Sequence, residues 1–303
     1  MSAGAARALT SAEIRDRMRA TAVGCVAVAL WAALALLTVA TNPVPPFQLA
    51  AMCFLVGGLA GLADARLRGV DLRAALGQPW PVWLVGVGGL FGYHFSYFTA
   101  LRGAPAAEAS LIAYLWPLLI VLFSGLLPGE RLRTRHVVGA VAGFAGAALL
   151  LAPGADSGSG EALGYAAACA CALIWSSYSV LSRVVGTAPT HAVAGFCLAS
   201  AALAAISHVA LETTVWPEGA LGWIAALALG LGPVGGAFYA WDVGCKRGDI
   251  QLLGVAAYAA PVLSTVLLVA AGMAEATPAL VIAAALIAGG ALVASGASPG
   301  RKA

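Results

Sequence analysis

The second half of this 303-residue chain repeats the first half at a nearly constant spacing. Matching positions carry identical or similar residues, and the clearest pairs are Trp31 and Trp175, Pro45 and Pro189, Gly92 and Gly236, Arg102 and Lys246, and Gly146 and Gly290. Each half also contains five apolar stretches, and an odd number of spans makes the second copy enter a bilayer from the opposite side. Inverted repeats are typical of proteins that expose one central site alternately to the two faces of a membrane. The repeat therefore favours a transporter.

The apolar stretches are long enough to cross a membrane. Hydrophobic residues make up 61% of the chain and charged residues 10%, whereas charged residues are about a quarter of an ordinary soluble domain. A span needs roughly 20 apolar residues, and segments that meet this need lie near 20–40, 46–64, 80–101, 105–127, 134–152, 161–182, 190–210, 219–245, 250–272 and 278–296. We expect an all-α integral membrane protein with ten transmembrane helices, arranged as two inverted five-helix repeats.

The positive charges predict the orientation of the spans. All of the 16 Lys and Arg residues except Arg102 fall in segments on one side of the predicted spans. Because loops rich in Lys and Arg remain in the cytoplasm, we expect both termini to be cytoplasmic. The resulting units are a cytoplasmic N-terminal segment at 1–19, a first five-helix repeat at 20–152, a linker at 153–160, a second five-helix repeat at 161–296 and a cytoplasmic tail at 297–303.

Polar and aromatic side chains within spans are the first candidates for a binding site, because they are costly in lipid. In the third span Tyr93, His94 and Tyr97 share one helical face, since they are three and four residues apart. On neighbouring spans we expect further site residues near the middle of the membrane, namely Tyr114, Trp116, Trp175, Tyr178 and Ser179. A second set, with Trp31, Tyr258 and the Phe238–Asp242 run, is expected nearer the inner side. The alternative is that these rings only pack between helices.

Three ionisable residues within the spans are candidates for coupling transport to an ion. His94 is one, because its ordinary pKa near 6.5 allows it to sense protons. Glu108 and Asp242 are the others, although each lies near a helix end and could instead extend toward water. Pro117 and Pro261 occupy matching places in the fourth and ninth spans, where an interior proline bends a helix. We expect either hinges or static bends there.

The sequence lacks the signatures of several other functions. No His-Glu-x-x-His motif, no Gly-x-Ser-x-Gly motif and no pair of intramembrane aspartates occurs, so we do not expect an enzyme. The six cysteines form no zinc-type pairs, and we expect neither a metal nor a cofactor. The net charge of +3 gives no reason to expect a nucleic acid partner.

Several motifs between about residues 20 and 296 resemble the EamA-type members of the drug/metabolite transporter superfamily. They are Ala29-Leu30-Trp31 and Leu173-Ile174-Trp175 at matching places in the halves, the Ala100–Ala109 junction, Gly129-Glu130-Arg131-Leu132, and the looser Gly272-x-x-Glu275. Two further motifs, Ala113-Tyr114-Leu115-Trp116-Pro117 and Trp241-x-x-Gly244, are similar to the branch that exports aromatic amino acids.

The resemblance implies an exporter in the bacterial inner membrane that moves aromatic and other neutral amino acids outward. Rings such as Trp116 and Trp175 would hold the substrate side chain by aromatic contacts, and alternating access would occur around that cavity. The alternative is an exporter of drugs or other small metabolites, whose cations would be drawn to Glu108 or Asp242. We expect membrane lipids around the protein, and a monomer rather than an obligate oligomer.

Overall fold

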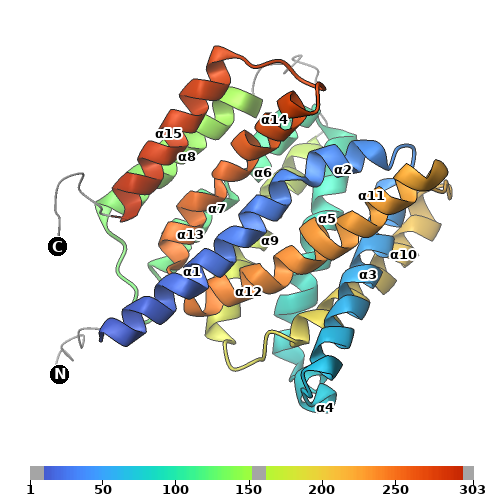
Figure 1. Cartoon of the computed structure of the whole chain (residues 1–303), viewed down its shortest axis with the longest axis horizontal. Helices are drawn as coiled ribbons and strands as arrows, with labels where there is room; N and C mark the ends of the chain where they lie inside the picture. The colour runs from blue at the N-terminus through green and yellow to red at the C-terminus, as the bar shows by residue number, and fades with distance from the viewer. Residues whose placement is uncertain (1–9, 152–161, 296–303) are drawn as a thin grey trace.

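The computed structural model describes residues 10–151 and 162–295, and every regular element in these ranges is helical (Figure 1). The first half contains α1 (Ser11–Ala32), α2 (Leu34–Ala40), α3 (Pro46–Leu67), α4 (Leu72–Leu76), α5 (Trp80–Gly103), α6 (Ala106–Ala113), α7 (Trp116–Ser124) and α8 (Thr134–Leu151). The second half contains α9 (Ala162–Val184), α10 (Ala192–Leu211), α11 (Gly219–Leu231), the π-helical segment η1 (Gly232–Gly236), α12 (Ala237–Arg247), α13 (Ile250–Ala257), α14 (Ala259–Ala270) and α15 (Pro278–Ser295). The predicted linker at 153–160 and tail at 297–303 lie outside the described residues.

The described helices include nine stretches that are long and apolar enough to cross a membrane. They match nine of the predicted spans, and several consist of two consecutive helices, such as α6 with α7 and α13 with α14. The 24-residue α5 has the length of a span but is not among the nine. Its Tyr-His-Phe-Ser-Tyr run lowers its hydropathy, because these residues are far less apolar than Leu or Val. The all-helical, multi-pass character of the prediction is therefore confirmed.

The first helix begins at Ser11, whereas the sequence predicted a span that starts near residue 20 after a separate N-terminal segment. The reason is a capping box at its start. The Thr10 hydroxyl accepts a hydrogen bond from the Glu13 backbone N–H at 3.2 Å, and the Glu13 carboxylate accepts one from the Thr10 N–H at 2.7 Å. Such a pair satisfies N–H groups that would otherwise lack partners at a helix start. The charged residues before the apolar stretch therefore belong to the same helix.

The two prolines predicted to bend helices lie just after complete interruptions. The fourth span ends as α6 at Ala113 and restarts as α7 at Trp116, with Pro117 in the first turn of α7. The ninth span is interrupted at Tyr258, three residues before Pro261. Proline is favoured in the first turn of a helix, where its missing N–H has no partner to lose. A third irregularity is η1, which interrupts the eighth span around Pro233.

The long helices associate in pairs. Helix α8 lies beside α15 (Figure 1), and the other extensive pairs are α5 with α9, α3 with α10, and α1 with α12. In the first pair the backbones approach so closely that a Cβ atom added to Gly139 would lie 2.5 Å from the Gly290 carbonyl oxygen. Small residues allow this approach in membranes, where helices associate by close packing rather than by water exclusion. The largest buried core lies between the α3/α10, α5/α9 and α1/α12 pairs.

Candidate functional site

Four tryptophans from four helices meet in this core. They are Trp31 of α1, Trp116 of α7, Trp175 of α9 and Trp241 of α12, which we call the four-tryptophan cluster. All six ring pairs are in contact, with centroids 5.0–6.3 Å apart, and most are edge-to-face. Each such pair contributes about 0.5–1.5 kcal/mol beyond the burial of its area. The cluster thus joins helices from both halves of the chain.

Two of the four indole N–H groups have fixed partners. Trp31 donates to the Pro233 carbonyl of η1 at 3.0 Å, and Trp241 donates to the Ser179 hydroxyl at 3.0 Å. That hydroxyl donates in turn to the Trp175 carbonyl at 2.8 Å. Among the described residues, neither Trp116 nor Trp175 has a partner for its indole N–H, although both side chains are at least 95% buried. Two hydrogen-bond donors therefore remain available inside the cluster.

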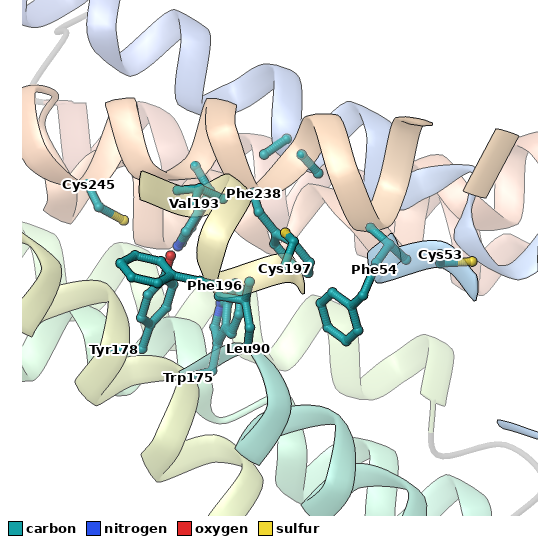
Figure 2. Close-up of a cluster of buried hydrophobic side chains, with 14 of the residues drawn as sticks. Cys53, Phe54, Leu90, Trp175, Tyr178, Val193, Phe196, Cys197, Phe238 and Cys245 are labelled. Atoms are coloured by element: carbon teal, nitrogen blue, oxygen red, sulfur yellow. The ribbon is translucent and has the colours of Figure 1, made fainter. Parts of the chain in front are cut away.

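A further set of aromatic side chains surrounds Trp175. Tyr93, Tyr178 and Phe238 lie with their ring centroids 5.1, 5.2 and 5.7 Å from it, and Figure 2 shows Tyr178 and Phe238 in the same buried region. Tyr97 stacks on Tyr93 at 6.0 Å, as expected for residues on one face of α5. Its hydroxyl lies 3.2 Å from that of Ser110 on α6. On the other side of the cluster, Tyr114 lies 6.4 Å from Trp116.

His94 lies beside the aromatic set. Its ring contacts Phe54, Tyr93, Phe98 and Phe238 at 5.0–6.1 Å. Its Nδ1 atom is 2.8 Å from the Leu90 carbonyl, an acceptor, so Nδ1 carries the hydrogen. The other ring nitrogen has no hydrogen-bond partner among the described residues. This geometry holds His94 one ring away from the four-tryptophan cluster.

Three predicted site residues lie elsewhere and have their own partners. Tyr258 packs against Phe144 in a separate core, and its hydroxyl accepts a hydrogen bond from the Leu118 backbone N–H at 3.1 Å. Glu108 accepts a short hydrogen bond from the Tyr165 hydroxyl of α9. Asp242 is 2.8 Å from the Lys246 ammonium and accepts a hydrogen bond from Thr190 at 2.8 Å. Both predicted coupling acids are therefore paired with protein groups.

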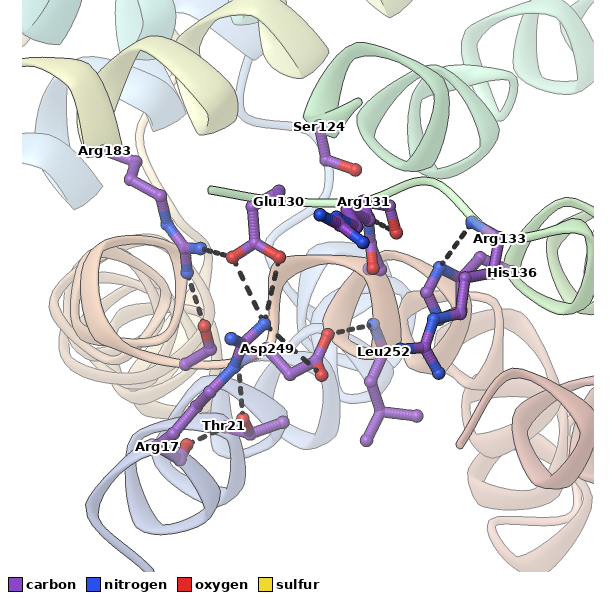
Figure 3. Close-up of polar contacts among 12 residues, drawn as sticks. Arg17, Thr21, Ser124, Glu130, Arg131, Arg133, His136, Arg183, Asp249 and Leu252 are labelled. Atoms are coloured by element: carbon purple, nitrogen blue, oxygen red, sulfur yellow. Dashed lines mark hydrogen bonds and ion pairs between the residues drawn. The ribbon is translucent and has the colours of Figure 1, made fainter. Parts of the chain in front are cut away.

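Glu130 organises a network of charges at one end of the helices, which we call the Glu130 end (Figure 3). Arg17 of α1 donates to both of its carboxylate oxygens at 3.1 Å, and Arg183 of α9 is 2.5 Å from one of them. Arg183 also donates to the Cys245 and Gly248 carbonyls, and Arg17 lies 3.5 Å from Asp249. The Glu130 network thus connects α1, the α7–α8 loop, α9 and the α12–α13 junction.

Glu212 organises a second network at the opposite end, the Glu212 end. Its carboxylate accepts hydrogen bonds from the backbone N–H groups of Phe47 and Gln48, all at 3.1 Å, in the first turn of α3. Arg102 of α5 lies 2.6 Å away, and His208 lies 3.0 Å away on the preceding turn of α10. An anion at a helix start is stabilised by the free N–H groups and the helix dipole. The Glu212 network thus connects α3, α5 and α10.

Rings that the sequence assigned to two sets lie together in the structure. Trp31, Phe238 and Trp241 were expected nearer the inner side, and they contact the set around Trp175 directly. Phe54, which the sequence did not single out, also lies in this region, with its ring 5.9 Å from that of Phe238. The sequence does contain one signal for the contact between Trp31 and Trp175. They occupy matching positions in the two halves, and equivalent residues of an inverted repeat approach the same axis.

The sequence pattern of the EamA-like transporter family matches residues 18–152. The protein named aromatic amino acid exporter YddG from Ancylobacter novellus is 59% identical over 92% of this chain and 98% of its own length. This chain belongs to the EamA-like transporter family. The Salmonella typhimurium protein with the same YddG name is 27% identical over 82% of this chain and 87% of its length.

A crystal structure supports the fold as well as the family. Its chain is 59% identical to this one, superposes with a TM-score of 0.87, and aligns over 92% of this chain and 98% of its own. As an EamA-like transporter, the protein is a multi-pass bacterial membrane protein that moves a small molecule. Within the described residues no group of three or more His, Cys, Asp or Glu side chains is arranged to hold a metal ion.

Proposed function

We propose that this transporter exports aromatic and other neutral amino acids across the bacterial inner membrane. The observation that carries the proposal is the four-tryptophan cluster with its two unpartnered indole N–H groups on Trp116 and Trp175. The printed name of the 59% identical relative points to the same substrate class. Such a cluster suits a flat ring by stacking and a carboxylate by hydrogen bonding.

In the proposed complex, rotation of the tryptophan and tyrosine side chains makes room for the substrate ring. Its carboxylate is bound by the indole N–H groups of Trp116 and Trp175. The hydroxyls of Tyr97 and Tyr114 and the free nitrogen of His94 bind the remaining polar atoms. Trp116 begins α7 directly after the interruption at Tyr114 and Leu115. Full charges are scarce in this site, so these neutral donors and acceptors have to satisfy both charged ends of the zwitterion.

Transport by alternating access requires two related halves, which we propose are the repeats at 20–152 and 161–296. The helix pairs support this proposal. Under the repeat, α1 corresponds to α9 and α12 to α5, so the α1/α12 pair corresponds to the α9/α5 pair. The α3/α10 and α8/α15 pairs each join equivalent helices. We count α5 as the tenth span because its length and its pairing with α9 match those of α12 with α1.

Changes of shape are proposed to centre on the interrupted spans. Pro117 and Pro261 follow matching interruptions in the fourth and ninth spans, and discontinuous helices commonly surround transport sites. With the orientation predicted from the positive charges, the Glu130 end faces the cytoplasm. The Glu130 network would separate when the site opens inward, and contacts at the Glu212 end would separate when it opens outward.

The alternative substrate class, organic cations, finds less support. Such a substrate would need a carboxylate at the aromatic site, and of the two acids predicted for this role Glu108 is bound by Tyr165 and Asp242 by Lys246 and Thr190. Using Glu108 would break its hydrogen bond with Tyr165, and using Asp242 would break its ion pair with the buried Lys246 ammonium. The geometry therefore favours an amino acid.

Transport in proteoliposomes tests the proposed function. The purified protein is reconstituted with unlabelled tryptophan inside, and the exchange of labelled tryptophan, phenylalanine and threonine is followed. We expect saturable exchange in the wild type and a loss of at least tenfold in Trp175→Ala, because the ring at the centre of the cluster is removed. Trp216→Ala is the matched control, since Trp216 is 59% exposed and lies outside the cluster. Movement of organic cations without movement of any amino acid would contradict the proposal.

A further inference from the structure

A crevice of about 520 Å³ lies between α3, the start of α10 and α12. Its volume falls within the range of about 300–1,000 Å³ that is typical of small-molecule sites. None of the four tryptophans lines it, so it is separate from the candidate substrate site. Its lining includes the polar side chains of Asp64, Arg68, His191 and Arg247.

The crevice extends from the Glu130 end toward the middle of the molecule. Its lining residues on α3 run from Gly57 to Arg68. Because a helix rises 1.5 Å per residue, this distance is about 16 Å, roughly half of the 30 Å hydrocarbon core of a bilayer. The crevice therefore runs along α3 from charged residues at the Glu130 end to mostly apolar residues near the middle of the molecule.

The inner end of the crevice is next to the four-tryptophan cluster. Gly236 of η1 and Tyr239 of α12 line it. On the other side of the same segment, the Pro233 carbonyl accepts the Trp31 hydrogen bond and Phe238 contacts Trp175. Short π-helical segments occur often at functional sites. One turn of irregular helix is thus in contact with the crevice and with the cluster.

The acidic and basic side chains that line the crevice match the two charged ends of a zwitterion. Asp64 is bound by Arg68 through one oxygen at 2.7 Å, and its second oxygen is 3.4 Å from the His191 Nε2 atom. Arg247 has no hydrogen-bond or ion-pair partner within the described part of the chain. A free guanidinium binds a carboxylate well, and the second Asp64 oxygen is able to accept a hydrogen bond from an ammonium group. A phosphate group would gain from the guanidinium but would be repelled by Asp64.

We propose that this crevice is a docking site for the zwitterionic head group of an α-amino acid at the Glu130 end. The ammonium group binds Asp64, the carboxylate binds Arg247, and the side chain points toward Tyr239 and η1. From there a change at η1 admits the substrate to the four-tryptophan cluster. This inference rests on the proposed function and adds a second binding site to it.

Side-specific kinetics with a blocked crevice test the docking site. Tryptophan transport is measured in right-side-out and inside-out membrane vesicles for wild type, Ala60→Trp and Leu59→Trp. Ala60 lines the crevice, whereas the neighbouring Leu59 does not and is 53% exposed. We expect Ala60→Trp to raise the KM about tenfold at the Glu130 face only, and Leu59→Trp to change neither face. A KM that is unchanged at both faces, or raised equally at both, would overturn the docking site while leaving amino acid transport established.

Competition by partial substrates tests the chemistry. Tryptamine carries only the amine and indole-3-propionate only the carboxylate. We expect Arg247→Gln to weaken inhibition by indole-3-propionate about fivefold. We expect Asp64→Asn to weaken inhibition by tryptamine by a similar factor. About fivefold is the effect expected when one charged hydrogen bond is lost at a solvent-exposed position. Arg66→Gln is the control, because Arg66 is exposed on the same helix and does not line the crevice.

A lipid is the competing occupant of the crevice. If Arg247→Gln instead removes a dependence of transport on phosphatidylglycerol, and both inhibitors act equally on all variants, the crevice binds a phospholipid head group and the proposal is wrong. A wild type that transports no amino acid would overturn the proposed function and the docking site together.

Discussion

The two ends of the molecule are each held by one buried glutamate, but by different kinds of partner. Glu130 lies in a loop and is bound by the side chains of Arg17 and Arg183, which come from separate helices. Glu212 lies at the end of α10 and is bound mainly by backbone N–H groups of α3. Glu130 is joined to α1 and α9 through long arginine side chains, whereas Glu212 bonds directly to the backbone of α3. We therefore expect α3 and α10 to move together at the Glu212 end.

The largest effect is expected from Glu130→Gln. Neutralising this carboxylate leaves the largely buried Arg183 without its charge partner, and breaking a buried ion pair costs several kcal/mol. Because Arg17 is partly exposed, we expect the free energy of unfolding to fall by about 2 kcal/mol. Thermal unfolding in detergent measures the change. Glu275→Gln is the control, since Glu275 lies in the looser copy of the same motif and is exposed. Equal midpoints for the two variants would refute a stabilising role for the network.

A smaller effect is expected from Arg183→Lys, which keeps the charge but loses the planar fork of donors. The guanidinium binds Glu130 and two backbone carbonyls, those of Cys245 and Gly248. A lysine at this position keeps the ion pair and loses at least one of the carbonyls, for a cost of about 1.5 kcal/mol. Arg102→Lys in the Glu212 network should cost less, because Arg102 is 45% exposed and has one carboxylate partner. Denaturation of both variants side by side would reveal a reversed order, which would contradict the comparison.

Glu212→Gln should cost less than Glu130→Gln. The glutamine carbonyl still accepts hydrogen bonds from the first turn of α3, so what is lost is the interaction of a full charge with the helix start and Arg102. We expect a loss of about 1 kcal/mol. Glu212→Leu, which removes the acceptor as well, should cost clearly more in the same unfolding assay. If Gln and Leu are equally destabilising, the backbone hydrogen bonds are not what holds α3.

The smallest effect is expected from salt. Raising NaCl from 0.1 to 1 M shortens the Debye length from about 10 to 3 Å and weakens partly exposed ion pairs. The stability difference between wild type and Glu130→Gln should shrink by roughly 0.5 kcal/mol. The difference for Glu212→Leu should shrink by a smaller fraction, because most of what that variant loses is backbone hydrogen bonds rather than its ion pair with Arg102. A salt dependence confined to the Glu212 variants would reverse the assignment of ionic and backbone character.

The membrane-spanning character and the family were predictable because both depend on local patterns. Apolar length and punctuation by Pro, Gly and charge located the spans, and short motifs such as Gly129-Glu130 carried the resemblance. Helix α1 begins at Ser11, before the predicted start of the span near residue 20, because hydropathy gives no information on a helix that continues beyond the lipid. The capping box at Thr10 and Glu13 was the signal for that boundary.

The composition of the aromatic cluster was harder to predict, because it depends on which helices pack together. Position along each span suggested that Trp31 and Trp175 lie at different depths, yet their rings are 5.7 Å apart. Large indole side chains extend several ångströms from their helices, so residues at different heights still meet. The contact of Thr190 with Asp242 and that of Arg17 with Glu130 were equally hard to predict, because the two residues of each pair are far apart in sequence.

The π-helical turn at η1 makes the arrangement of rings depend on chain length as well as on residue type. A π turn corresponds to one residue inserted into an α-helix, and each residue of an α-helix turns the chain by about 100°. Deleting a single residue between Gly232 and Gly236 would therefore rotate α12, with Phe238 and Trp241, away from Trp175 while leaving every side chain of the cluster in the sequence. A one-codon change in the length of this segment would thus remove the cluster with no substitution of a tryptophan.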